Sequence, residues 1–548
     1  MVAADSSFRV SLVLLSLCIV FRLVGPMSVE AAADPKSSKG LLDVRDCGAV
    51  GDGATLDTKA IQKAIDDCAQ QGGGRVCLRG GTFLSGTLNL KSRVTLDIES
   101  GAVLLGSKNL QDYPVQASAY RSYTDNYTDK SLIYAEKADG IAIVGRGVID
   151  GQGASFKGPY KVRPYLIRII ECRNVTVRDV TIQNSPMWVQ HYMACENVTI
   201  DGITVHSNVN ANNDGIDIDS CDKVRISNCE INSGDDAIVL KSTSDRPCRN
   251  VTVTNCVLSS RCNALKCGTE SNGGFEDITI SNCTIHDTNL AGIALELVDG
   301  GRFDQVCVSN VTMRNVGGGI FVRLGNRARP FRAKGPGGAQ GTFTLEEGME
   351  RPAMGSMRNL ILSNVQATGV GSVGCSITGL PGSPVENVTL ENVRIAFAGG
   401  GTRKNAERPI AENAENYPEF KMFGTLPAYG FYCRHVQNLT FHNVALEFEK
   451  PDQRPALVFD DVKDLGLLDF DAKSTSATKA AIWLQQVQGA LIHGCRPRAT
   501  ATTFVRVDGD RSSGISVMDN DLSRVKTVLE KGNEVSENAV HLGNNRLK

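Results

Sequence analysis

The sequence predicts an all-β fold, a right-handed, single-stranded parallel β-helix, and three observations lead to this prediction. A short phrase recurs through most of the chain, the apolar runs between its occurrences are short and β-branched, and glycine is frequent while aromatic residues are few. Of the 548 residues, 41% are hydrophobic and 6% aromatic, with 55 glycines. This balance favours many short strands joined by turns over a helical core.

The recurring phrase consists of an apolar residue, any residue, an Asn-like residue and a second apolar residue. Its first six occurrences begin at Cys172, Cys195, Cys221, Cys248, Phe275 and Phe303. Consecutive starting positions differ by 23, 26, 27, 27 and 28 residues. A repeat this short cannot bury a core alone and must stack on its neighbours. The first positions then form one interior column, so we expect most of the 17 cysteines to be free core residues, with disulfides as the alternative.

The chain is expected to contain four segments. Residues 1–33 would be a signal peptide, 34–110 an N-terminal capping helix with the first coils, 111–475 the β-helix that carries the site, and 476–548 further coils of the same helix. Arg9 precedes an apolar run from Val10 to Phe21, and small residues near Ala33 suit cleavage. A membrane anchor is the alternative, although a span needs about 20 apolar residues. We therefore expect a secreted or periplasmic protein without a membrane segment after cleavage.

Other segments interrupt or precede the coils. Residues 57–71 read as a short amphipathic helix with Ile61, Ile65 and Cys68 on one face and Asp57 as its cap. Such a helix would cover the open end of the stack, which otherwise exposes unpaired strand edges. Residues 327–355 and 399–423 fit no coil and are predicted to be long loops, which are usually functional or disordered.

A cluster of aspartates follows from aligning the third strand of each coil. The first apolar residues of these strands are Val189, Ile216, Ile238, Leu265, Ile293 and Ile320. Two residues earlier stand Asp214 and Asp236 on neighbouring coils, with Asp235 adjacent. Crowded carboxylates push one another's pKa values apart, so one can stay protonated while another is ionised. Glycosidic cleavage needs such a pair; a calcium site or a solvated acidic turn is the alternative.

These aspartates lie in phrases that resemble a known family. Asn213-Asp214-Gly-Ile-Asp and Gly234-Asp235-Asp236 are similar to motifs of glycoside hydrolase family 28, the polygalacturonase and rhamnogalacturonase family. Further similar phrases begin at Asp46, Gly147 and Asn184, and the resemblance covers roughly residues 41 to 470. It implies a pectin-lyase-like β-helix and an inverting hydrolase. Asp235 would be the general acid, while Asp214 and Asp236 would hold and deprotonate the attacking water.

The sequence departs from the family pattern at two motifs. Cys262-Asn263-Ala264 replaces Gly-His-Gly, and Ala294-Leu295-Glu296 replaces the Arg-Ile-Lys that grips a galacturonate carboxylate. Lys266 and Arg323, one coil to either side, are predicted to supply the cations instead. The alternative for Arg323 is an exposed ladder with Glu296, like one between Lys241 and Asp219, and such ladders are worth little. The expected substrate contacts are completed by Asn213, Asn263, Glu296, His191 and Trp188.

Charge and spacing limit the partners. The net charge of −2 argues against general nucleic-acid binding, and no Cys-x2-Cys or His spacing suggests a metal, so we expect no cofactor. The expected partner is a polysaccharide, acidic in character, bound by a monomer. Two rival hypotheses remain: a lyase or epimerase on the same fold with Lys266 as base, and a non-catalytic carbohydrate-binding β-helix.

Overall fold

The computed structural model describes residues 40–120, 122–332, 347–497 and 502–548. The chain from Lys39 to Lys548 forms one compact unit. The predicted signal peptide lies outside the described residues. No helix among the described residues is long and apolar enough to cross a membrane.

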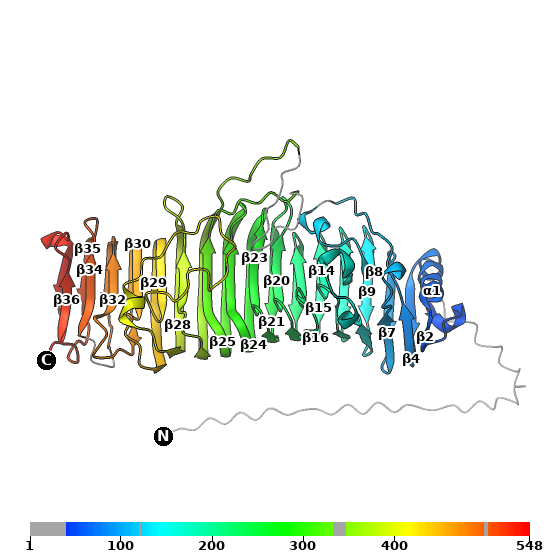
Figure 1. Ribbon diagram of the computed structural model, residues 1–548, viewed down its shortest axis with the longest axis horizontal. Helices are drawn as coiled ribbons and strands as arrows, with labels where there is room; N and C mark the ends of the chain where they lie inside the picture. The colour runs from blue at the N-terminus through cyan, green and yellow to red at the C-terminus, as the bar shows by residue number, and fades with distance from the viewer. Residues whose placement is uncertain (1–39, 121, 333–346, 498–501) are drawn as a thin grey trace, which may run out of the picture. The chain divides into compact units, whose positions relative to one another are not determined.

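Short strands pair in parallel with their equivalents one coil away, and the pairings follow three columns (Figure 1). The column that carries the site, called the site column below, contains β5 (Leu88–Asn89), β8 (Ser131–Glu136), β11 (Tyr165–Ile170), β14 (Gln190–Met193), β17 (Ile216–Asp219), β20 (Ile238–Ser242) and β23 (Leu265–Ser271).

The second column contains β1 (Leu41–Asp43), β3 (Gly74–Leu78), β6 (Val94–Ile98), β9 (Asp139–Val144), β12 (Arg173–Arg178), β15 (Glu196–Asp201), β18 (Asp222–Ser227) and β21 (Cys248–Thr254). The third contains β2 (Asp52–Leu56), β4 (Gly81–Ser85), β7 (Ala102–Gly106), β10 (Val148–Asp150), β13 (Thr181–Gln183), β16 (Thr204–Ser207), β19 (Glu230–Ser233) and β22 (Val257–Ser260).

Toward the C-terminus several strands run through more than one column. They are β24 (Gly274–Leu297), β25 (Arg302–Leu324), β26 (Ser356–Val370), β28 (Val385–Gly399), β29 (Phe431–Lys450) and β30 (Leu457–Leu468). The remaining strands are β27 (Cys375–Thr378), β31 (Asp471–Ala472), β32 (Ala480–Gln485), β33 (Gln488–His493), β34 (Thr503–Asp508), β35 (Ser513–Met518), β36 (Thr527–Lys531) and β37 (Val540–Gly543). The predicted parallel β-helix is confirmed.

The recurring phrase has the structural role that its residue types indicate. Asn174, Asn197 and Asn250 take the left-handed φ values of 53°, 58° and 53°, which Asn tolerates better than most residues, so the chain turns there into the second column. The first positions from Cys172 to Cys248 are buried. All sixteen cysteines that the structure describes are free, and this confirms the core interpretation for the buried ones.

Helix α1 (Thr58–Gln70) lies at the N-terminal end of the coils, where Ile61, Ile65 and Cys68 are buried in the main core (Figure 1). The predicted cap is wrong in detail. The carboxylate of Asp57 accepts hydrogen bonds from the backbone N–H groups of Val50 and Gly51, at 2.7 and 2.9 Å, and makes no cap bond. The helix is therefore tied to the loop before it.

The two predicted loops leave the coils between β25 and β26 and between β28 and β29. Residues 333–346 of the first loop lie outside the described residues. The second loop contains the short helix α2 (Arg403–Ala406) and brings Tyr417 and Glu419 back to the site column.

Candidate active site

The three predicted aspartates meet at one pocket beside the starts of β17 and β20. Ile216 pairs with Ile238 in these strands, so Asp214 and Asp236, each two residues earlier, lie on adjacent coils. The pocket has a volume of about 280 Å³. It is lined by Tyr127, Tyr160, Met187, Trp188, Asn212, Asp214, Asp235, Asp236, Lys241, Cys262, Glu270, Tyr417 and Glu419.

One step of the predicted alignment is wrong. His191 pairs with Asp217, so Gln190, and not Val189, is the partner of Ile216. The shift by one residue aligns Trp188 with Asp214, and both side chains line the pocket.

Asp235 and Asp236 have opposite protonation tendencies although they are neighbours. Burial, and then the charge of Asp236, raise the pKa of Asp235. Burial also opposes ionisation of Asp236, but Lys266, Lys241 and Asn263 outweigh it and hold the pKa of Asp236 below its usual value. The Oδ1 atom of Asp236 accepts the backbone and side-chain N–H groups of Asn263 at 3.1 and 2.9 Å. The pair therefore offers one acid and one base.

Asp214 is buried with fewer donors. Its Oδ1 has no hydrogen-bond partner within the described residues, and its Oδ2 lies 3.7 Å from the Lys241 Nζ. Burial, and then the charges of Asp217 and Asp235, raise the pKa of Asp214 well above its usual value. An unpartnered buried oxygen that lines a pocket is placed to receive a donor from a ligand.

Lys241 is a buried cation of the site, and the alternative of an exposed ladder with Asp219 does not hold. The Lys241 Nζ lies 3.7 Å from Asp214, 3.7 Å from Asp217 and 3.5 Å from Glu270. It also lies 4.7 Å from the ring centroid of Trp188. Glu270 is held in turn by Arg329 and is close to Arg327. Nothing in the spacing of Glu270 predicted its place at the pocket, because it follows a register shift in β23.

Lys266 contacts the candidate base directly. The Lys266 Nζ lies 3.1 Å from Asp236 Oδ2 and 3.8 Å from Glu296 Oε2, and its side chain is 2% exposed. Burial favours neutral Lys266, but Asp236 and Glu296 outweigh burial and raise its pKa well above the usual value. Lys266 and Asn263 thus stabilise the ionised form of Asp236 through an ion pair and hydrogen bonds.

Arg323 and Asn213 do not occupy the predicted positions. The Arg323 guanidinium donates to Thr378 and to the carbonyls of Gly379, Glu412 and Asn413. It therefore anchors the second loop and forms no ladder with Glu296. The amide of Asn213 donates to the carbonyls of Ser185 and Met187, both at 2.9 Å. This fully buried amide holds the turns and does not line the pocket.

His191 and Trp188 occupy different layers. Trp188 lines the pocket, whereas His191 lies beneath it, with the two rings 5.2 Å apart in an edge-on arrangement. The His191 Nε2 is 3.1 Å from Asp219 Oδ2, and the ring is fully buried. Burial lowers the pKa of His191. His191 thus packs against Trp188 and is not among the residues that line the pocket.

Loop residues complete the wall of the pocket, and no motif or spacing in the sequence predicted them individually. Tyr127 and Tyr160 come from segments before β11, and Tyr417 and Glu419 from the loop after β28. The Asn263 Nδ2 lies 3.4 Å from a carboxylate oxygen of Glu419. The length of the 399–423 loop was the one hint of function.

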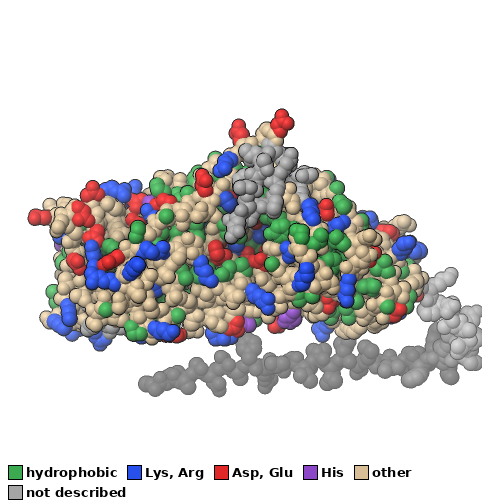
Figure 2. All heavy atoms as spheres, in the orientation of Figure 1, with side chains coloured by type: hydrophobic (Ala, Val, Ile, Leu, Met, Phe, Trp, Pro, Cys, Tyr) green, Lys and Arg blue, Asp and Glu red, His purple; other side chains and the backbone are tan. Residues whose placement is uncertain are grey.

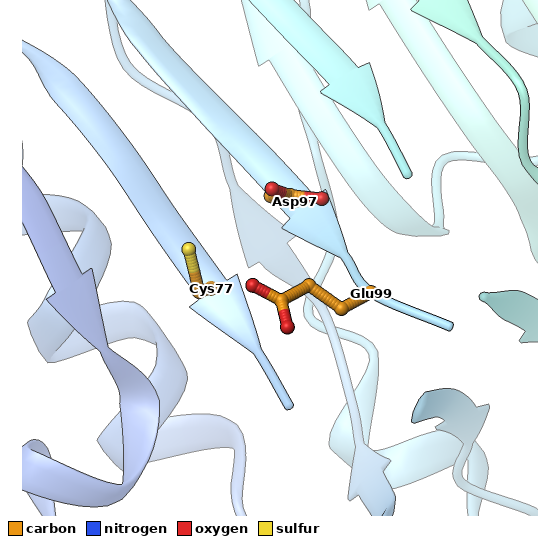
Figure 3. Close-up of side chains that lie close together, drawn as sticks. All are labelled: Cys77, Asp97 and Glu99. Atoms are coloured by element: carbon orange, nitrogen blue, oxygen red, sulfur yellow. The ribbon is translucent and has the colours of Figure 1, made fainter. Parts of the chain in front are cut away.

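Two groups of side chains come close enough to share a metal ion. Cys77, Asp97 and Glu99 form one group on β3 and near β6 (Figure 3), but their carboxylates pair with Arg75 and Arg79. Asp235, Asp236 and Cys262 form the other at the pocket. Burial, Asp236 and Asp235 raise the pKa of Cys262 far above its usual value.

Comparisons with known proteins agree with this geometry. The family model described as glycosyl hydrolases family 28 matches residues 75–413. A Vitis vinifera protein named probable polygalacturonase is 35% identical over 245 residues, 42% of this chain and 49% of that protein. The exo-poly-alpha-D-galacturonosidase of Dickeya chrysanthemi is 31% identical over 252 residues, 36% of this chain and 41% of that protein. The chain thus spans about half the length of the curated relatives it matches.

Solved structures show the same fold. An exopolygalacturonase from Thermotoga maritima superposes with a TM-score of 0.52 at 22% identity, covering 76% of this chain and 93% of that one. A family 28 exopolygalacturonase from Yersinia enterocolitica gives 0.58 at 20% identity, covering 79% of each. At these sequence identities, the comparison shows that the β-helix fold is shared.

Proposed function

The chain belongs to glycosyl hydrolase family 28, and from this premise we propose that it hydrolyses glycosidic bonds in a pectin-like or other uronate-containing polysaccharide. The observation that carries the proposal is the pocket in which Asp235 tends to be protonated and Asp236 ionised. We also propose that the protein is exported, to the periplasm or out of the cell, and that it acts as a monomer.

In the proposed reaction, Asp235 donates its proton to the leaving glycosidic oxygen as the bond to the anomeric carbon breaks. Ionised Asp236 takes a proton from a water molecule whose oxygen bonds to that carbon from the opposite face. Asp214, with its unpartnered Oδ1, holds the water. One water is consumed, and attack from the opposite face inverts the anomeric configuration.

The alternative of a lyase requires Lys266 to act as the base, and its surroundings do not favour this role. Lys266 would have to be neutral to remove a proton from a sugar, but its ammonium is enclosed by Asp236 and Glu296, and its pKa is raised. A buried ammonium 3.1 Å from the ionised carboxylate of Asp236 stays charged. The geometry therefore supports hydrolysis over elimination.

The test is Asp235→Asn assayed for new reducing ends on pectic polysaccharides. A positioned acid contributes roughly 10² to 10⁴-fold, so we expect a loss of that order with the thermal midpoint retained, and an inverted product anomer by NMR. Undiminished activity in this variant would refute the role of Asp235. Glycan binding without cleavage by the unaltered protein would instead support the non-catalytic alternative.

A further inference from the structure

The charges that line the pocket are unequal. Five of the lining side chains are carboxylic: Asp214, Asp235, Asp236, Glu270 and Glu419. Lys241 is the single cation among the described lining residues. Of these five, Asp236 and Glu270 have lowered pKa values, so a uronate carboxylate placed here would meet two ionised carboxylates and one cation, and like-charge contacts at a desolvated site are costly.

Lys241 is already committed to the protein. Its ammonium has three carboxylate neighbours within 4 Å, and its side chain is 6% exposed. Burial opposes its charge, but Glu270, Asp214 and Asp217 outweigh burial and keep its pKa well above the usual value. A substrate carboxylate would have to compete with three fixed carboxylates for one ammonium.

The cations behind the wall are paired as well. Lys266 is held by Asp236 and Glu296. Arg327 pairs with Asp299, and Arg329 with Glu270. On the face drawn in Figure 2, the basic and acidic side chains of the described residues are interspersed. Arg163 lies against Tyr160 and donates to the Ala211 carbonyl and the Asn212 side chain, but it is not among the described residues that line the pocket. Among those lining residues, no cation is therefore free of a carboxylate partner.

The same wall suits an uncharged sugar. Of the four aromatic lining residues, Tyr160 and Tyr417 are half-buried and can contact the apolar face of a sugar ring, whereas Trp188 and Tyr127 are buried. The Oδ1 of Asp214 is buried without a hydrogen-bond partner within the described residues. A sugar hydroxyl can pair with this oxygen whether Asp214 is ionised or protonated, because a hydroxyl both donates and accepts.

We propose that the sugar whose anomeric carbon is attacked in this pocket is neutral, and that any uronates of the polysaccharide bind outside it. This proposal rests on the proposed function, since it assigns the sugar unit that the same aspartates process. It places cleavage after a neutral unit of a mixed pectic chain.

The experiment identifies the sugar at the newly formed reducing end. Mixed pectic polysaccharide that contains both galacturonate and neutral sugars is incubated with the protein, and new ends are reduced with borodeuteride and identified by mass spectrometry. Asp235→Asn, treated in the same way, provides the blank. We expect deuterium in a neutral alditol at about tenfold or more over the uronate-derived aldonate, the ratio that 1.4 kcal/mol corresponds to.

The outcomes separate the two proposals. Deuterium mainly in the uronate-derived product would overturn the neutral-sugar proposal and leave hydrolysis standing. No deuterium above the Asp235→Asn blank from any pectic substrate would overturn the hydrolase proposal, and the neutral-sugar proposal with it.

Discussion

Replacing Lys266 with methionine should both destabilise the protein and change its pH dependence. The Lys266–Asp236 pair is nearly inaccessible, with side chains 2% and 4% exposed and a separation of 3.1 Å. Removing one partner of such a pair leaves an uncompensated buried charge, at a cost of about 3–5 kcal/mol in the free energy of unfolding. Glu296, whose Oε2 is 3.8 Å from the same ammonium, would lose a partner too.

Loss of Lys266 should shift the pH dependence of activity to higher pH. Lys266 lowers the pKa of Asp236, so its loss raises that pKa, and Asp236 stays protonated to higher pH. A hydrogen bond to a charged group is worth about 1.5–3 kcal/mol, or roughly 1 to 2 pKa units at 1.36 kcal/mol each. The acidic limb of the rate profile should therefore move up by about 1 to 2 pH units, and Lys266→Arg should restore most of it.

The measurements are denaturant unfolding and the pH profile of reducing-end release. The control is Lys223→Met, which breaks the exposed 2.7 Å pair with Glu196 and should change neither, because exposed pairs contribute little. If Lys266→Met kept the acidic limb of the unaltered protein while remaining folded, Asp236 could not be the base that Lys266 maintains.

Three further predictions concern the buried charges and the cysteines. Burial raises the pKa of Glu296 to about 8 in the folded protein, from a value near 4.3 in the unfolded chain. Between about pH 4.3 and 8 the folded state therefore holds a proton on Glu296 that the unfolded state has lost. The free energy of unfolding should fall as pH rises through this range, by up to about 1.4 kcal/mol per pH unit. Glu296→Gln should reduce this dependence of the free energy of unfolding on pH. An unchanged dependence would mean that another group causes it. Arg329→Met should cost about 3–5 kcal/mol in urea unfolding, since it deprives the buried Glu270 carboxylate of a partner; a loss below 1 kcal/mol would contradict the network. A reducing agent should change neither the thermal midpoint nor the free energy of unfolding, because the described cysteines are free. A decrease of about 2–4 kcal/mol in the free energy of unfolding would reveal a disulfide.

The sequence alone determined the architecture and the three central carboxylates. A β-helix repeats one local solution in every coil, so the spacing of Cys172, Cys195 and their equivalents already fixes which residues stack. The same counting placed Asp214 and Asp236 on adjacent coils, because the register between β17 and β20 has no bulge.

Only the tertiary structure decided what surrounds them. Whether Lys241 points to Asp219 or to Asp214 depends on side-chain torsions in a crowded interior, and these depend on packing across several coils. Arg323 turns to loop carbonyls, and Glu419 reaches the pocket from a loop more than 150 residues from Asn263. Such contacts join parts of the chain that share no repeat, so no local pattern encodes them. The charge available to a substrate is therefore a property of the fold, and it was the part of the site that residue spacing predicted wrongly.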